Sequence, residues 1–506
     1  MILNRGEQKH QRWATVALIL IIAFSAAVST YRVFSLPILQ CPDEDSHIDY
    51  AFSLYSAGHL LNVRDAPSSG WNVKHRAPYH KWERISHRYT LHLTDATRMY
   101  QVRISEDGKV PEDYGTRSFF DQIDRTAPQS PAKTDGLAPV DNPGLVSMYP
   151  FGYYALVAAE MWVVRLFSDS LVWTFFSARL LSVGLLIATL ALSFAVLRQV
   201  HSRYALPITA IVGLFPVTTY VSSCVQADNL SLTLVVLSWY LGLLAYKDFD
   251  RRYVRIFLSV SLSVLLVTKQ HHYIFAAVPI LALLIAKHRP SPAVILAMLF
   301  PSLALYSVQV WIEWKPPFES KFVTFALDRL LAGIPRAIME YYGGGYAYTS
   351  YWSTSYGWKT VPNFMKVILQ VSTVLALLAV AIGLAKTAVR LWIIAKWRPT
   401  IALPLALDPL ATGHLLFLGF MILLFALTAN EFTAQGRHFF PYVLSGFYLV
   451  VTFAPRILPS GRLRNRLSTL VIILLLMSCA VGQYHALAAL GPRYYPDASS
   501  VSRGLR

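Results

Sequence analysis

Two adjacent carboxylates and a nearby imidazole follow the first long apolar run of the chain. Asp43 and Glu44 come just after this run, and His47 stands one helical turn further along. A carboxylate that is partly withdrawn from water has a raised pKa, which suits a general base, and His47 could assist it. Asp43 is the predicted base, with Glu44 orienting the loop. The structural alternative is that Asp43 caps the helix that follows, with acidic groups in its first turn.

Three cations elsewhere in the sequence could neutralise a phosphate. Arg437 stands at the start of an apolar run, where a guanidinium can hold a phosphate through two parallel hydrogen bonds. Lys269 lies in a short polar turn between two apolar runs, and Arg179 lies inside another run. Alternatively, Arg437 and Lys269 only reach toward the membrane surface, and Arg179 pairs with a carboxylate such as Asp228.

Other polar and aromatic residues could contact a substrate. Asp228 opens an apolar run, where it could equally be a helix N-cap. The remaining candidates carry rings or amides, although such rings also form the aromatic belts of membrane proteins: Tyr153, Tyr154, Trp358, Gln435 and His438. The sequence has no phosphate-binding Gly-rich loop and no zinc-type His/Cys spacing. No cofactor is therefore predicted, although the acidic residues 43–45 leave a divalent metal possible.

The composition places these residues in a membrane protein. The chain has 506 residues, of which 55% are hydrophobic and 14% are charged. Its apolar runs of roughly 18 to 25 residues are long enough to cross a bilayer as helices. The net charge of +17 could indicate nucleic-acid binding. However, the Lys and Arg residues gather in short connections between apolar runs, which is typical of a membrane protein.

We predict an all-α integral membrane protein with about eleven transmembrane helices. The spans are expected at residues 13–36, 173–197, 204–222, 229–246, 256–267, 273–286, 293–311, 364–385, 414–429, 439–453 and 467–487. The first apolar run is too long for a signal peptide, so we expect it to be retained. The sections are the N-terminus with the first span (1–36), a first loop (37–172), a bundle (173–311), a second loop (312–363), a C-terminal bundle (364–487) and a tail (488–506).

The large first loop is expected to carry helices on the membrane surface. Apolar residues recur at near-helical spacing in residues 47–61, and residues 148–167 are again amphipathic and aromatic. Alternation in residues 88–104 could form a short hairpin.

The distribution of basic residues predicts the orientation. Nineteen Lys and Arg residues lie in the N-terminus and in the connections on its side of the membrane, whereas the short opposite turns hold only Lys269 and Arg437. Cytoplasmic loops carry such an excess. The N-terminus is therefore predicted to be cytoplasmic, and the candidate site to be on the outer face. Cys41 and Cys224 are both expected on that face, where a disulfide is conceivable, but we expect Cys41 to be a free thiol.

Five short stretches together resemble one family. Residues 42–47 resemble the Pro-Asp-Glu-x-x-His motif of a bacterial polytopic membrane family long catalogued as of unknown function, which is similar to GT-C glycosyltransferases that use polyprenyl-phosphate sugars. The other stretches follow in the family's order: residues 148–154, Ser222 with Asp228, residues 356–362 and residues 435–441. His438 stands where a Tyr is common, and residues 358–360 replace an apolar-acidic pair, which could alter the choice of acceptor.

The resemblance implies a GT-C-like fold and activity. Members of that class place an acidic residue after the first span, on the outer face, as catalytic base. The resemblance therefore implies that Asp43, or less readily Glu44, deprotonates an acceptor hydroxyl. Arg437, with Lys269 and Arg179 as helpers, would neutralise the departing lipid phosphate. A polyprenyl-monophosphate donor of this class generally needs no metal.

We therefore expect a glycosyltransferase of the bacterial cytoplasmic membrane. It would move a hexosyl or pentosyl group from a polyprenyl phosphate to an envelope glycan, glycolipid or protein, with inversion at the anomeric carbon. Its expected partners are the donor, the acceptor and the lipid bilayer, with no nucleic acid. Two alternatives stay open: a flippase or transporter of lipid-linked saccharides, and a ligase or polymerase that consumes a lipid-pyrophosphate glycan.

Overall fold

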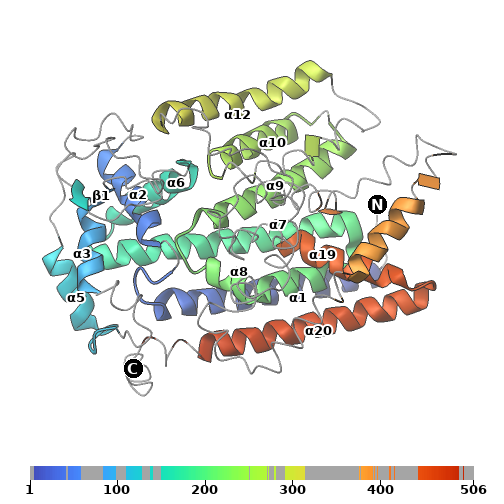
Figure 1. Ribbon diagram of the computed structural model, residues 1–506, viewed down its shortest axis with the longest axis horizontal. Helices are drawn as coiled ribbons and strands as arrows, with labels where there is room; N and C mark the ends of the chain where they lie inside the picture. Colours follow the sequence, from blue (N-terminus) through green and yellow to red (C-terminus); the bar gives the residue numbers. More distant parts are fainter. Residues whose placement is uncertain are drawn as a thin grey trace, which may run out of the picture.

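The computed structural model of the chain is predominantly helical (Figure 1). It describes residues 5–41, 44–58, 84–97, 110–127, 137–140, 150–249, 251–269, 291–313, 378–390 and 443–488, with a few single positions between these ranges. Its main elements are α1 (Arg5–Ser35), α2 (Glu44–Ala57), β1 (Arg84–His87), α3 (Arg88–Ala96), α5 (Arg117–Thr126), β2 (Leu137–Val140), α6 (Gly152–Arg165), α7 (Leu171–Leu214), α8 (Pro216–Val221), α9 (Ala227–Lys247), α10 (Arg252–Leu266), α12 (Pro292–Glu313), α19 (Val443–Phe453) and α20 (Gly461–Ala488).

Five of these helices are long and apolar enough to cross a membrane, namely α1, α7, α9, α12 and α20. Large apolar side chains such as Leu20, Phe24 and Leu474 are exposed on α1 and α20, as expected for helices that face lipid. The prediction of a membrane protein with several helical spans is therefore confirmed. The expected spans at 273–286 and 414–429 lie almost wholly outside the described residues, so the count of about eleven stays a prediction.

Helix α7 contains two passes joined at a kink. His201 has non-helical backbone angles, with φ −155° and ψ 77°. A side chain on Gly213 would touch Leu190, yet these positions would be about 35 Å apart in a straight helix. The chain must therefore turn back at His201. This agrees with separate spans at 173–197 and 204–222, although the second pass ends at Leu214 and α8 follows it.

Several other helices pack directly against α7. Helices α1, α9, α19 and α20 all contact it, and α10 packs between α9 and α12 (Figure 1). The hydroxyls of Thr189 on α7 and Thr233 on α9 share a hydrogen bond of 2.8 Å. Such short polar side chains allow membrane helices to approach closely and to bond to each other.

The first loop holds a small two-stranded sheet in place of the predicted hairpin. Strand β1 pairs antiparallel with β2, with Arg84 opposite Val140 and His87 opposite Leu137. The expectation of a hairpin in residues 88–104 was wrong, because a helix, α3, begins at Arg88. Tyr89 and Leu93, four residues apart, are both buried, so the helical spacing of these larger apolar residues outweighs the short alternation.

Helix α2 confirms the expectation of a helix near residue 47, but it does not lie open to the membrane surface as expected. It begins at Glu44, and it buries Ile48 and Phe52 on one side, while His47 and Asp49, on roughly opposite sides of the helix, are buried as well. It packs against α6 and α3, so protein covers faces that were expected to meet membrane or water. Helix α6, in contrast, keeps large apolar side chains exposed, such as Trp162. Just beyond the end of the helix, the side chain of Phe167 is 85% exposed.

Candidate functional site

Most of the predicted site residues that the structure describes gather at one end of the helical bundle. At this end α1 and α10 finish and α7 and α9 begin, and α2, α3, α5 and α6 lie beside it at the left of Figure 1. We call it the site end and define it by Glu44, Asp228 and Lys269.

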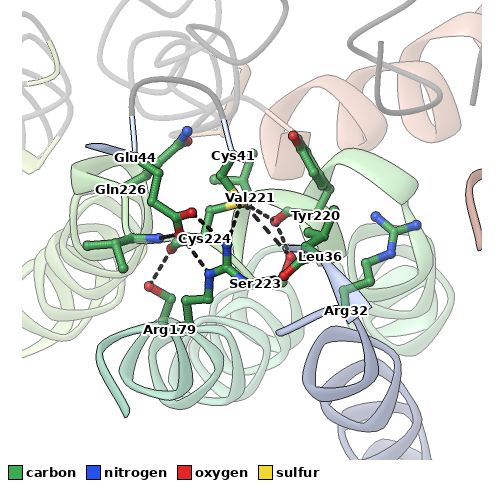
Figure 2. Close-up of a disulfide and its surroundings, with 12 residues drawn as sticks. Arg32, Leu36, Cys41, Glu44, Arg179, Tyr220, Val221, Ser223, Cys224 and Gln226 are labelled. Carbon is green, nitrogen blue, oxygen red and sulfur yellow. Dashed lines mark hydrogen bonds and ion pairs between the residues drawn. A yellow bond between two sulfur atoms is a disulfide. The ribbon is translucent and has the colours of Figure 1, made fainter. Parts of the chain in front are cut away.

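Glu44 and Arg179 form a fully buried ion pair at the site end (Figure 2). Arg179 Nε donates to Glu44 Oε1 at 2.8 Å and Nη2 donates to Oε2 at 2.6 Å, and both side chains are 0% exposed. Nη1 also donates to the carbonyls of Val33 and Leu36 at 2.8 and 2.7 Å, and Nη2 to that of Pro37 at 2.9 Å. Every nitrogen of this guanidinium is thus engaged within the protein.

The ion pair lies between two helix ends of opposite polarity. The carbonyls of Val33 and Leu36 belong to the end of α1, where the helix dipole is negative and favours the cation of Arg179. Glu44 is the first residue of α2, where the dipole is positive and favours a carboxylate. The pair therefore holds the end of one helix against the start of the next.

This geometry decides between the two interpretations of Arg179. The alternative that Arg179 pairs with a carboxylate is confirmed, although the partner is Glu44 and not Asp228, the carboxylate named as an example. Arg179 was also expected to help bind a donor phosphate, yet its guanidinium has no donor left for a ligand. Glu44 Oε1 accepts a second hydrogen bond, from the backbone N–H of Val225 at 3.1 Å, which ties the start of α2 to the turn between α8 and α9.

A disulfide joins Cys41, on the segment after α1, to Cys224, in the turn between α8 and α9 (Figure 2). Their Cα atoms are 5.9 Å apart, and 183 positions separate them in the sequence. The expectation that Cys41 is a free thiol was therefore wrong. Two cysteines so far apart in sequence can be recognised as partners only when the fold brings their Cβ atoms together.

The turn that holds Cys224 is fixed by side chains from two helices. Ser182 of α7 donates its hydroxyl to the Cys224 carbonyl at 2.8 Å. Asn229 of α9 donates to the carbonyls of Val221 and Cys224 at 3.0 and 3.2 Å. These bonds give hydrogen-bond donors to the buried Cys224 carbonyl, which lies beyond the C-terminal end of α8.

The segment between α1 and Cys41 is buried and locally strained. Leu39 has a φ of 63°, in the left-handed region that a bulky residue occupies only at a cost of about 1–2 kcal/mol. The backbone N–H of Ile38 donates to the hydroxyl of Tyr114 at 2.8 Å, which ties the segment to the first loop. Asp43 itself lies outside the described residues, but its neighbours Cys41 and Glu44 are both buried and bonded.

His47 and the two tyrosines of α6 form buried contacts that join α6 to α2 and to α7. His47 Nδ1 and the Tyr154 hydroxyl are hydrogen bonded at 2.7 Å, and the Tyr153 hydroxyl lies 3.3 Å from that of Ser182. Burial raises the pKa of Tyr153, so it stays a neutral phenol. Both tyrosines are 0% exposed. They were expected to contact substrate, but in this structure they hold α6 against its neighbours.

Asp228 and Lys269 form a second buried ion pair at the site end, with each side chain 7% exposed. The N-cap of α9 is Gln226, so the interpretation of Asp228 as an N-cap was wrong; Asp228 lies in the first helical turn. The backbone N–H of Gly152 donates to the Val267 carbonyl at 2.6 Å, which brings the start of α6 beside Lys269. The structure therefore brings Asp228 and Lys269 close to the start of α6, which carries Tyr153 and Tyr154.

A cavity that the sequence did not point to lies between α3 and α5, with a volume of about 450 Å³. Its polar lining includes His92, Asp95, Asp113 and Gln122. His92 Nε2 donates to the Ile123 carbonyl at 2.9 Å, because a carbonyl oxygen can only accept. The spacing of His92 and Asp95 on one face of α3 was the only signal in the sequence.

The other predicted site residues lie outside the described residues. They are Asp43, Trp358, Gln435, Arg437 and His438.

Comparison with known proteins identifies a family. No curated protein and no solved structure matches the chain. The sequence model of a family described as predicted membrane proteins (DUF2142) matches residues 24–445. This match covers the site end and most of the chain, so the protein belongs to the DUF2142 family of predicted membrane proteins.

Proposed function

We propose that this protein is an integral membrane glycosyltransferase that moves a sugar from a polyprenyl-phosphate donor to an extracytoplasmic acceptor. One observation carries the proposal: Cys41 and Glu44, the described residues on either side of positions 42 and 43, are both held in place. Cys41 is linked to Cys224, and Glu44 is paired with Arg179. A general base needs a fixed position relative to the proton that it removes, and such bracing supports that role for Asp43.

In the proposed reaction, Asp43 accepts the proton of an acceptor hydroxyl while the hydroxyl oxygen attacks the anomeric carbon. The bond from that carbon to the phosphate oxygen breaks on the opposite face, so the configuration inverts and a polyprenyl phosphate leaves. Arg437 and Lys269 would neutralise the departing phosphate, and Asp228 would hold Lys269 in place. The proposed reaction requires no metal.

The charge distribution supports an extracytoplasmic site end. Basic residues gather at the opposite end of the described helices, in the short connections that follow α9 and α19 and at the kink of α7: Arg198, Arg203, Lys247, Arg251, Arg252, Arg456, Arg462 and Arg464. Cytoplasmic connections are enriched in such residues. This supports the proposed orientation, with a cytoplasmic N-terminus, for a protein that we propose to lie in the bacterial inner membrane.

Transfer of label from a panel of polyprenyl-phosphate sugars by the purified protein in lipid nanodiscs tests the proposal. The wild type should transfer sugar from at least one donor, and Asp43→Asn should lose about 10²–10⁴-fold in rate. Asp121→Asn, which changes an exposed carboxylate on α5, is the matched control and should behave as wild type. Movement of lipid-linked saccharide across vesicles without glycosyl transfer would favour the flippase alternative.

Arg437→Ala should raise the donor concentration needed for half-maximal rate in the same assay, because a bidentate phosphate contact is lost. Arg437→Lys keeps the charge and should recover part of the loss. An unchanged donor requirement in Arg437→Ala would mean that Arg437 makes no contact with the donor phosphate.

A further inference from the structure

We infer that the Cys41–Cys224 disulfide is introduced by a dithiol oxidase at the site end, and that it completes the assembly of residues 36–41, the segment that follows α1. The inference concerns a covalent modification and a transient protein partner. Glycosyl transfer is not needed for either part of it.

Noncovalent contacts already bring the two cysteines together. Arg179 holds the end of α1 and Glu44, on either side of Cys41. Ser182 and Asn229 hold the carbonyl of Cys224. The resulting Cα separation of 5.9 Å is within the usual range for a disulfide. These contacts hold the two cysteines at bonding distance in the folded protein (Figure 2).

The disulfide is buried once it has formed. Cys41 and Cys224 are both 0% exposed, so dissolved thiols have no direct access to the sulfur atoms. A buried bond of this kind acts as a permanent structural link and must form before the surrounding helices close over it. The oxidation is therefore a step of folding and not a reversible switch.

The chemistry requires an oxidant and a compartment. One thiolate of this chain attacks a disulfide of the oxidase and forms a mixed disulfide, and the second thiolate then displaces the oxidase. The chain loses two protons and two electrons, and the oxidase leaves as a dithiol. Because disulfides persist outside the reducing cytosol, this step places the site end in an oxidising compartment.

The link has a mechanical consequence for the segment that it anchors. Leu39 holds a left-handed backbone conformation two residues before Cys41. Strained conformations of this kind persist only where the surroundings over-determine them. Without the link, we expect the segment around Leu39 to relax, while the Glu44–Arg179 pair stays buried.

Thiol counting tests the bond. The chain has three cysteines, and Cys479 is the free one among those described. Acid-quenched, denatured protein treated with a maleimide–polyethylene glycol should gain one adduct without reductant and three after reduction. Cys479→Ser should gain none and two. Three adducts on unreduced wild type would overturn the inference.

Expression in a host that lacks its extracytoplasmic dithiol oxidase tests the partner. Unreduced wild type from that host should gain three adducts, and restoring the oxidase should return the count to one. A single adduct in the absence of the oxidase would overturn the assignment of the partner.

Hydrogen exchange tests the assembly. Backbone amides of residues 38–41 should exchange at least tenfold faster in the Cys41→Ser/Cys224→Ser double variant than in wild type. The matched control Cys479→Ser removes a buried sulfur elsewhere and should leave this segment unchanged. Equal exchange in the double variant and in wild type would overturn the positioning role. These readouts are independent of transfer activity, so the inference and the proposed function can fail separately.

Discussion

Charged side chains that are shielded from water are the main features of this protein at the scale of single residues. Glu44 and Arg179 are both 0% exposed and share two hydrogen bonds. A buried ion pair is not by itself a large source of stability, because both ions lose their hydration. Removal of one partner is costly, however, since the other charge is left buried and uncompensated.

Arg179→Gln and Glu44→Gln should each destabilise the protein by about 3–5 kcal/mol, whereas the double variant should lose less than the sum. Thermal unfolding in detergent measures the effect. The exposed pair Arg117–Asp121 provides the control, because Arg117→Gln changes a side chain that is 95% exposed and should barely move the Tm. A wild-type Tm in Arg179→Gln would contradict the structural role of the pair.

Glu160 on α6 should make stability depend on pH. Its Oε2 is buried without a hydrogen-bond partner among the described residues, and burial raises its pKa to about 7, partly offset by a hydrogen bond from Ser177. The folded state then holds this proton more tightly than the unfolded state, so stability falls as the pH rises from about 4.5 to about 7. The gain in Tm from Glu160→Gln should therefore be larger at pH 8 than at pH 5. A gain in Tm that is the same at pH 5 and at pH 8 would show that Glu160 is ionised in the folded protein at both pH values.

Close contacts between helix ends dominate at the scale of elements. A Cβ atom at Gly152 would lie 2.7 Å from the carbonyl oxygen of Val267, so only glycine lets the start of α6 meet the end of α10. This contact sets the position of Lys269, two residues beyond Val267. The start of α6 thus packs against the backbone that leads to Lys269, although Tyr153 and Tyr154 of α6 were expected to contact the substrate.

Gly152→Ala should destabilise the protein by about 1–3 kcal/mol, because the added methyl group meets backbone that cannot easily give way. Gly184→Ala on α7 is the matched control, since a Cβ there meets nothing within 4 Å. Its Tm should be equal or slightly higher, as alanine favours helix. Equal melting of both variants would mean that α6 can shift away from α10 at little cost.

The sequence predicted elements better than it predicted partners. Apolar periodicity correctly indicated helices near residues 44–57 and 152–165, because that signal is local. It could not show that β1 pairs with β2, or that Arg179 reaches Glu44, because both pairs are distant in sequence. The alternative interpretation of Arg179, in which it pairs with a carboxylate, named Asp228 only as an example, since charge type alone did not separate Asp228 from Glu44.

At the scale of the whole molecule, the ends of the bundle differ in charge. At the site end the buried Arg179 and Lys269 are paired with carboxylates, whereas the opposite end carries the basic residues of the short connections between helices. The orientation predicted from the sequence rests on this same distribution of basic residues. The proposed transfer to an extracytoplasmic acceptor requires that the site end faces away from the cytoplasm.

Matched serine-to-cysteine variants can determine the orientation. Ser118 at the start of α5 and Ser202 beside the kink of α7 are both exposed and lie at opposite ends of the bundle. A membrane-impermeant maleimide should label Ser118→Cys in spheroplasts, and should label Ser202→Cys only after the membrane is broken. The reverse pattern would place the site end in the cytoplasm.

The link between Cys41 and Cys224 also turns much of the chain into a closed ring. The ring contains α2, the first loop, α6 and both passes of α7, because these elements all lie between the two cysteines. A protease that cuts the backbone once inside the ring cannot release a fragment until the protein is reduced. Backbone breaks or inserted sequences in the first loop can therefore be tolerated without separation of α1 from α9, the two helices that flank the proposed site.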